Sequence, residues 1–225
     1  RGDVDYLETH PDDAFSVNSI GAENIARISK ENKIRLVHIS TDSVFDGIKG
    51  NYSEEDEPNP VNIYAKSKFE GEKNISKISN NYLIIRTNFY GFYSSGKYFF
   101  NWILNNIKQK NDFLGFADVI FSPLDVATLS KLIVESLSIN YNGILHLASD
   151  MSISKYDFIK ITLDHFNLKN PLIKASIDKQ NLVAKRPKNT SLNNHKSKNL
   201  FKIEIPNYID WLNENKILIN RYLNN

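Results

Sequence analysis

Tyr64 and Lys68 stand four residues apart and follow a strand-like run that ends in Ser40-Thr41-Asp42. Residues four apart on a helix share one face, so the phenol and the ammonium can lie side by side. Reduction of a ketone by hydride transfer leaves negative charge on the oxygen, and a proton must neutralise it. A phenol with an ordinary pKa near about 10 is a weak acid, and a neighbouring ammonium lowers that pKa. With a hydroxyl at the end of the strand, the pair predicts proton transfer to a carbonyl oxygen.

The spacing alone is weak evidence for this chemistry. Tyr93/Lys97 and Tyr156/Lys160 have the same spacing, and chance gives about one such pair in a chain of this composition. The first of these pairs lies in a Gly/Ser-rich stretch, and the second follows no strand that ends in a hydroxyl. The alternative for Tyr64 is an aromatic side chain that packs on a helix face beside a solvated lysine.

The surrounding sequence predicts a parallel sheet. Strands are predicted at 36–39 and 82–85, a helix at 63–78, and a loop at 46–62, where glycine and proline gather. Strand, helix and strand at this spacing imply a crossover connection between parallel strands. Open α/β sheets bind ligands at the carboxyl ends of such strands, which is where Thr41 would lie. Residues at steps of three and four predict one narrow helical face before the first strand: Ala14, Val17, Gly21, Ile25 and Ile28.

The second half of the sequence is less regular. Helices are predicted at 99–107, 124–137, 154–166 and 206–219, and a strand at 144–147. Ser122-Pro123 is the predicted start of the second of these helices, Ser154 the predicted cap of the third, and Pro206 is predicted in the first turn of the fourth. Residues 178–200 are polar and basic with little periodicity, so no regular element is predicted there.

Composition excludes several classes of protein. A net charge of +2 over 225 residues argues against binding to nucleic acid or an anionic membrane. No apolar stretch approaches the roughly 20 residues of a membrane span. The chain has no cysteine, which excludes disulfides and thiolate metal sites and fits a reducing cytoplasm. The acidic run at 54–57 could bind a divalent cation, but a solvated loop is the simpler interpretation, and we expect no metal.

Several motifs together resemble a known family. Residues 37–47 read VHISTDSVFDG, 51–60 read NYSEEDEPNP and 64–72 read YAKSKFEGE. In the same order follow IRTNFYG at 85–91, FSPL at 121–124, GILHLA at 143–148, Arg186-Pro187 and TSL at 190–192. This combination resembles the extended short-chain dehydrogenase/reductases and, within them, the dTDP-4-dehydrorhamnose reductase family.

The resemblance implies an α/β fold, with a Rossmann-like, doubly wound parallel sheet and a small C-terminal substrate-binding lobe. It implies a partial dinucleotide-binding domain at 1–150 and the lobe at 151–225, to which segments near 88–123 also contribute. It also implies NADPH or NADH as cofactor and reduction of a 4-keto deoxysugar nucleotide for cell-surface polysaccharide precursors. We allow for a homodimer, and we expect no nucleic-acid or membrane partner.

The resemblance also assigns roles to single residues. Tyr64 is the implied proton donor, Thr41 the hydroxyl that binds the substrate carbonyl, and Lys68 the lysine that tunes the tyrosine and holds the nicotinamide ribose. Ser40 is implied to contact the cofactor as well. The implied substrate-binding residues are Asp42, Asn88, Phe89 and Arg186, the last suited to a diphosphate because its planar fork binds such oxygens bidentately. Asn18 resembles an asparagine that supports the proton relay.

The sequence departs from the family pattern at two places. Ser43 stands where the family commonly has a tyrosine, so one aromatic contact to the sugar is missing. The glycine-rich strand–turn–helix that cradles the dinucleotide pyrophosphate is not found. We therefore interpret the sequence as an N-terminally truncated reductase, in preference to a divergent protein without cofactor. Two other functions stay open: a non-catalytic regulatory or binding subunit of the same fold, and a nucleotide-sugar epimerase or dehydratase.

Overall fold

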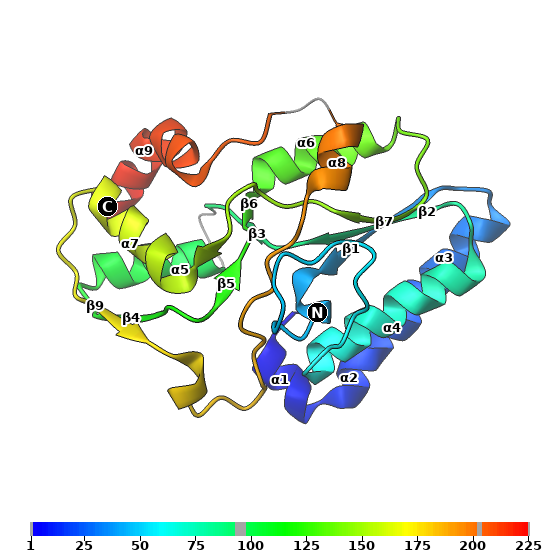
Figure 1. Ribbon diagram of the computed structural model, residues 1–225, viewed down its shortest axis with the longest axis horizontal. Coiled ribbons are helices and arrows are strands. Elements are labelled where there is room, and N and C mark those ends of the chain that lie inside the picture. Colours follow the sequence, from blue (N-terminus) through cyan, green and yellow to red (C-terminus); the bar gives the residue numbers. More distant parts are fainter. Residues whose placement is uncertain (1, 93–97, 202–203, 225) are drawn as a thin grey trace.

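A three-stranded parallel sheet forms the centre of the first lobe. The computed structural model describes residues 2–92, 98–201 and 204–224. The strands β1 (Leu36–Thr41), β2 (Tyr82–Thr87) and β7 (Gly143–His146) lie in the order β1-β2-β7, and all neighbours are parallel. Helix α4 (Ile63–Ile78) connects β1 to β2, as the sequence predicts (Figure 1).

Both faces of the sheet are covered by helices. Side chains alternate along β2, so Leu83 and Ile85 point to one face and Ile84 to the other. The first two pack against α6 (Val126–Ser136), whereas Ile84 packs against α3 (Gly21–Glu31) and α4. Figure 1 shows α6 on the opposite side of the sheet from α3 and α4. The continuous apolar run of β2 is therefore typical of a parallel strand buried on both sides.

A long helical segment precedes β1. It comprises α1 (Val4–Thr9), α2 (Pro11–Phe15), the π-helical turn η1 (Ser16–Ile20) and α3. Pro11 occupies the first position of α2, and Asp12 and Asp13 lie in its first turn. The sequence did not predict α1 at all.

Small and polar side chains form the contact between this segment and α4. Asn18, Ala22, Ala26 and Ser29 are buried there. A Cβ added at Gly71 of α4 would lie 2.3 Å from the Asn18 carbonyl oxygen. The two helices therefore approach so closely that larger side chains have no room.

The apolar face predicted from residues 14–28 is directed mainly at solvent. Val17, Ile20, Ile25 and Ile28 are between 51% and 54% exposed. We call these four residues the apolar stripe. Close to it, β1 is an edge strand, since its only partner among the described residues is β2. This part of the surface thus combines exposed apolar side chains with an unpaired strand edge.

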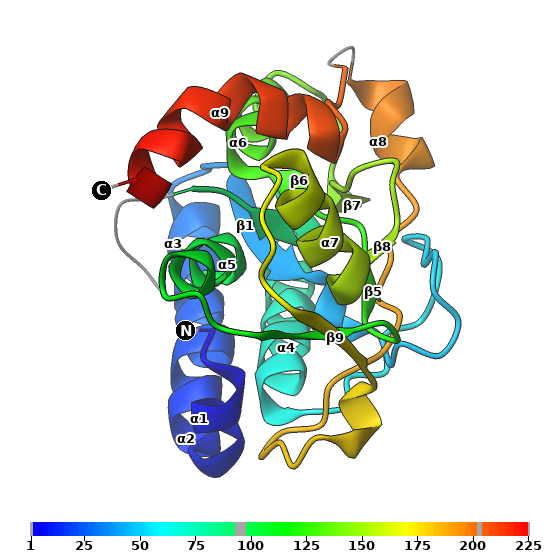
Figure 2. The same cartoon turned by 90° about the vertical axis from the view of Figure 1, so that its left-hand side faces the viewer.

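The second lobe has a core of its own, rich in aromatic side chains. Phe158 stacks on Tyr208 with ring centroids 3.9 Å apart, and Trp211 and Tyr90 pack around them. The lobe is built from both halves of the sequence (Figure 2). Its elements are α5 (Phe99–Lys108), β4 (Phe113–Phe116), β5 (Ile120–Phe121), β8 (Ile153–Ser154), α7 (Lys155–His165), β9 (Leu172–Ala175), η3 (Ile177–Lys179) and α9 (Tyr208–Asn224).

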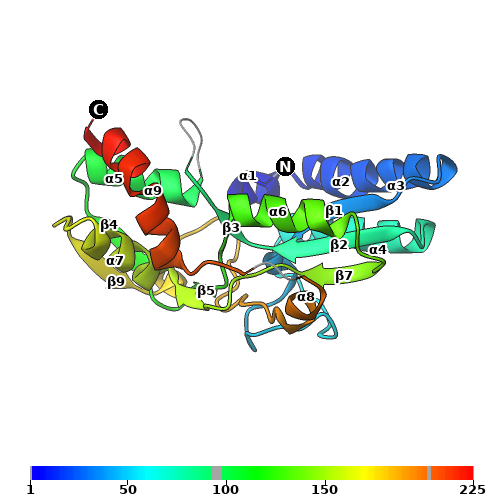
Figure 3. The same cartoon turned by 90° about the horizontal axis from the view of Figure 1, so that it is seen from above.

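Short pairings connect the two lobes. β3 (Phe89–Tyr90) runs parallel to β6 (Leu124–Asp125) where the chain passes from one lobe to the other. Residues 185–194, which we call the strap, return from the second lobe to the first and lead into α8 (His195–Leu200). The strap forms bridges from Asn189 to Ile120 and from Leu192 to Tyr52. Figure 3 shows the lobes side by side, with α9 over the second one.

Some predicted boundaries are wrong by a few residues. β2 continues through Arg86 to Thr87, and α6 begins at Val126 with Asp125 as its cap, not after Ser122-Pro123. α9 begins two residues beyond Pro206. The cap of α7 is Ser154, as predicted. None of the described helices is long and apolar enough to cross a membrane.

Candidate active site

Thr41 and Tyr64 meet at the carboxyl end of β1. Asn62 caps α4 by accepting a hydrogen bond from the Ala65 N–H at 2.9 Å, which starts the helix just before Tyr64. The Tyr64 hydroxyl lies within hydrogen-bonding reach of Thr41. Burial raises the pKa of Tyr64, the interaction with the Thr41 hydroxyl opposes this, and the charge of Asp42 adds to it. The structure therefore favours the protonated phenol.

Lys68 lies one turn further along α4 and contacts the backbone of β1. Its Nζ donates to the Ile39 carbonyl oxygen at 2.7 Å and lies 3.4 Å from His38 Nε2. Burial lowers the pKa of Lys68, and the charge of Glu72 raises it. The sequence predicted that Lys68 lowers the pKa of Tyr64, and this effect stays a prediction. The largest influence on that pKa in the structure is burial, which raises it.

His38 shares this environment with Lys68. Burial, and next the charge of Lys68, lower the pKa of His38 to about 4. The imidazole is therefore neutral at pH 7 and does not compete with the ammonium for a negative charge.

Asp42 joins three parts of the chain at one buried carboxylate. It is 1% exposed, and Thr41, Asn88 and Thr190 donate hydrogen bonds to it at 3.1, 3.0 and 2.7 Å. The Ser43 hydroxyl adds a fourth bond at 3.3 Å. Burial raises the pKa of Asp42, and the hydrogen bonds from Thr190 and Asn88 oppose this. Most acceptor positions of Asp42 are thus occupied by the protein, which suits a residue that orients Thr41.

Two buried hydroxyls at the same end of the sheet have no hydrogen-bond partner among the residues that the structure describes. They are Ser40 Oγ and Thr87 Oγ1, and their strands are neighbours, with Thr41 opposite Thr87. By alternation along β1, Ser40 lies on the same face as His38 and hence near Lys68. The unpartnered Ser40 hydroxyl and the Lys68 ammonium could hold the hydroxyls of a ribose. The residues present therefore fit a nicotinamide cofactor.

A cleft of about 460 Å³ opens beside Thr41 and Asp42, between the two lobes. Polar side chains from the first lobe and the strap line one end: Asp42, Ser43, Asn88 and Thr190. Apolar side chains from the second lobe line much of the rest: Phe99, Trp102, Leu114, Phe116, Val119, Phe121 and Ile159. The cleft thus has the polar and apolar halves that a sugar joined to a nucleobase requires.

Not all of the predicted substrate-binding residues line this cleft. Asn88 and Arg186 line it, whereas Phe89 does not and is 45% exposed. The Arg186 guanidinium donates to the Asp5 carboxylate at 2.8 Å and to the Ala184 carbonyl oxygen at 3.0 Å. Two of the five N–H groups of Arg186 are therefore engaged within the protein.

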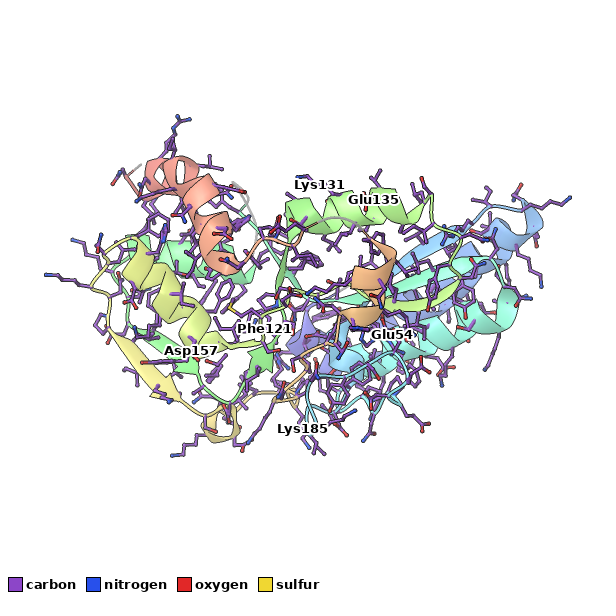
Figure 4. All side chains as sticks on the ribbon, turned by 45° about the horizontal axis from the view of Figure 1, so that its top comes forward. Glu54, Phe121, Lys131, Glu135, Asp157 and Lys185 are labelled. Carbon is purple, nitrogen blue, oxygen red and sulfur yellow. The ribbon has the colours of Figure 1, made fainter. Side chains whose placement is uncertain are left out.

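Sequence reasoning missed Lys155, which also lines the cleft. Its Nζ lies 3.4 Å from the centre of the Phe121 ring and 4.0 Å from that of Phe99. Figure 4 labels Phe121 at the junction of the two lobes. Lys155 stands at the first position of α7, and no motif marks it, because the two rings come from segments far away in the sequence.

The other candidate groups have structural roles. Lys160 forms an ion pair with Asp164 on the surface of α7, and Tyr93/Lys97 lies outside the described residues. Glu54 in the acidic run accepts a hydrogen bond from the His146 backbone N–H at 2.8 Å. In the described ranges, no group of three His, Cys, Asp or Glu side chains is placed to hold a metal ion. Asn18 donates to the Ser67 hydroxyl at 3.0 Å, which fixes α4 to the preceding helix.

The fold and the site together define an α/β protein of the short-chain reductase type. The RmlD substrate binding domain family matches residues 2–220, and the chain belongs to this family. The dTDP-4-dehydrorhamnose reductase of Aggregatibacter actinomycetemcomitans is 35% identical over 217 residues, which are 89% of this chain and 72% of that protein. The predicted Rossmann-like α/β fold and reductase family are confirmed.

A solved structure and a second relative are also similar. The dTDP-4-dehydrorhamnose reductase of Bacillus anthracis, in complex with NADP, superposes with a TM-score of 0.90 at 31% identity. The match covers 97% of this chain and 78% of that one. Methionine adenosyltransferase 2 subunit beta of Bos taurus is 30% identical over 196 residues, 84% of this chain and 59% of that protein.

Proposed function

We propose that the protein reduces a 4-keto deoxysugar nucleotide, of the dTDP-4-dehydrorhamnose type, with NADPH in preference to NADH. The observation that carries the proposal is the contact of Thr41 with Tyr64 beside Lys68, at the carboxyl end of β1 and next to the cleft. The reductases of the same family and the NADP complex of one of them support it. The product would enter cell-surface polysaccharide synthesis.

The chain's own residues provide the proton and its positioning. The reduced nicotinamide, when bound, supplies the hydride. The substrate carbonyl oxygen lies between Thr41 Oγ1 and the Tyr64 hydroxyl, and Tyr64 donates the proton as charge develops on that oxygen. The raised pKa of Tyr64 keeps the phenol protonated at neutral pH, which is the form a donor needs. Asp42 orients Thr41, and Lys68 with Ser40 would hold the ribose of the cofactor.

Asn88 contributes to substrate binding directly, at the polar end of the cleft. Arg186 and Phe89 take part at the rim, the former only after its ion pair with Asp5 opens. We divide the chain as the sequence suggests, with the catalytic residues in 1–150 and the substrate lobe in 151–225, joined by segments near 88–123.

The test is reduction of a dTDP-4-keto-6-deoxyhexose, followed as loss of NADPH absorbance. Tyr64→Phe should lose at least about 100-fold in kcat, the lower end of what a positioned acid contributes, and should still bind the substrate. Tyr156→Phe is the matched control, because Tyr156/Lys160 has the same spacing away from the cleft, and its activity should not change. Wild-type activity in Tyr64→Phe would show that another group delivers the proton.

The reductases among the relatives and solved structures support the enzyme. The alternative that the sequence leaves open is a non-catalytic binding subunit, and methionine adenosyltransferase 2 subunit beta is also a relative. Such a protein would bind a nucleotide without consuming NADPH in the same assay. The similarity to dehydratases and epimerases is below 20% identity and supports only the fold.

We further propose that the protein is a cytoplasmic homodimer. The apolar stripe supports the dimer, because four exposed apolar side chains on one helical segment are suited to an interaction surface. The cytoplasm is proposed because the nucleotide sugar and the reduced cofactor are both made there.

A further inference from the structure

Lys155 is a cation in the cleft without a polar partner. Its Nζ lies between the rings of Phe121 and Phe99. Among the residues that the structure describes, no hydrogen bond or ion pair engages this ammonium; its polar neighbour is the Asp42 carboxylate, which acts on it only through charge. An ammonium has three N–H donors, and a cation held between two rings loses much of its hydration. A group with unused donors in such a place is suited to a ligand.

The other cation of the cleft is already engaged. Arg186 is bound by the Asp5 carboxylate and the Ala184 carbonyl oxygen. The carboxylate of Asp5 thus offsets the charge of Arg186 and uses one of its five N–H groups. No described carboxylate forms an ion pair with Lys155, so Lys155 is the better candidate for the first contact with a negative charge.

Lys155 also contacts both kinds of lining in the cleft. Its ammonium interacts through charge with Asp42, which belongs to the polar lining. It lies against the rings of Phe121 and Phe99, which belong to the apolar lining. In a nucleotide sugar, the diphosphate separates the sugar from the base. A sugar among the polar side chains and a base among the apolar ones would bring the diphosphate to the boundary between them, where Lys155 stands.

We propose that Lys155 binds a diphosphate oxygen of the nucleotide sugar and is the principal cation that recognises it. This inference deepens the proposed function and rests on it for the class of substrate. The neighbouring rings keep water away and thereby strengthen the attraction between the ammonium and the phosphate. The resulting pair is a charge-assisted hydrogen bond.

The protonation of Lys155 provides a signature for this role. Burial lowers the pKa of Lys155 to about 7, and the charge of Asp42 opposes this. A diphosphate binds the protonated form, so affinity should fall as the pH rises above about 7. The other charged groups on the surrounding elements are already paired or serve as a helix cap: Asp118 with Lys188, Asp5 with Arg186, and Asp157 with Ser154.

The experiment measures binding of dTDP-glucose to the full-length protein by calorimetry at pH 6 and pH 8.5, without cofactor. Both phosphates of this ligand keep one charge each across the range, so the ligand itself does not titrate. If only the protonated form binds, the wild type should lose about 30-fold in affinity, in proportion to the competent fraction. Lys155→Arg should bind equally at both pH values, because arginine stays charged. Lys155→Met should bind weakly at both, and Lys160→Met, on the exposed face of the same helix, should resemble the wild type.

Several results would overturn the proposal. A pH-independent wild-type affinity, a fall in affinity that persists in Lys155→Arg, or wild-type or tighter binding by Lys155→Met would each do so. If Lys155→Met fails to fold, the comparison of the wild type with Lys155→Arg still decides. Because no turnover is measured, failure of the proposed reduction would leave the expected binding pattern intact, and an active reductase with normal binding by Lys155→Met would refute the role of Lys155 alone.

Discussion

Glu72→Gln should destabilise the protein strongly, because it breaks a fully buried ion pair. Glu72 and Arg86 have side chains that are each 2% exposed. Arg86 Nη2 donates to Glu72 Oε2 at 2.7 Å, and Nε lies 3.1 and 3.2 Å from the two carboxylate oxygens. The amide of glutamine would direct an N–H group at the guanidinium in place of one oxygen. It would also leave the arginine charge buried without a counter-charge.

The expected cost follows from burial. Breaking a buried pair by removing one partner costs about 3–5 kcal/mol. For a chain of this size, about 2–4 °C of Tm is lost per kcal/mol, so Tm should fall by roughly 6–20 °C. The pair joins α4 to β2, and α4 carries Tyr64 and Lys68, so turnover should fall as well. Loss of the Glu72 charge should lower the pKa of Lys68 further, since that charge raises it.

Urea unfolding followed by circular dichroism measures the effect, and two variants serve as controls. Glu70→Gln removes an exposed ion pair with Lys73 on the same helix and should cost no more than about 0.5 kcal/mol. The double variant Glu72→Met/Arg86→Met removes both charges. It should recover most of the stability, because an apolar replacement of a buried pair is often neutral or stabilising. The reasoning is refuted if Glu72→Gln unfolds within about 1 kcal/mol of Glu70→Gln, or if the double variant is the least stable of all.

Two further predictions concern the helices before β1. Gly71→Ala should cost about 1–3 kcal/mol, because the new Cβ would lie 2.3 Å from the Asn18 carbonyl oxygen. Gly21→Ala, whose Cβ would meet nothing closer than 3.6 Å, should be neutral or stabilising by up to about 1 kcal/mol; equal thermal stability of the two variants would contradict the close helix contact. Replacing Ile25 and Ile28 together with lysine should convert a dimer into a monomer with unchanged fold, as measured by analytical ultracentrifugation. A wild type that sediments as a monomer at micromolar concentration would remove the basis of the proposed dimer.

Local sequence patterns predicted the elements that carry the proton-transfer group. The bounds of α4 and the parallel pairing of β1 with β2 followed from periodicity and from the strand–helix–strand spacing, which depend on the local sequence. Periodicity also found the apolar stripe, but it could not show that the opposite side of the helix packs on Gly71. Burial of that side is decided by the close approach of a second helix, which no local pattern encodes.

The contacts that complete the site are long-range and were not predictable. Asp42 was expected to meet the substrate and does line the cleft, but its hydrogen bonds with Asn88 and Thr190, which lie 46 and 148 residues away in the sequence, were not predicted. Lys155 lines the cleft because α7 packs against the segments that carry Phe99 and Phe121. Short two-residue strands such as β5 and β8 likewise leave no periodic signal, since they exist only as a pair.

The strap determines when the site can be completed during synthesis of the polypeptide. Thr190 completes the hydrogen bonds of Asp42 from 148 residues further along the chain. At a synthesis rate of about 5–20 residues per second, the ribosome delivers Thr190 roughly 7–30 s after Asp42. Until then Thr41 and Tyr64 have no closed cleft beside them. A nascent chain therefore carries its proton donor well before it can select a substrate, and a ribosome stalled before residue 190 would hold a protein without a finished site.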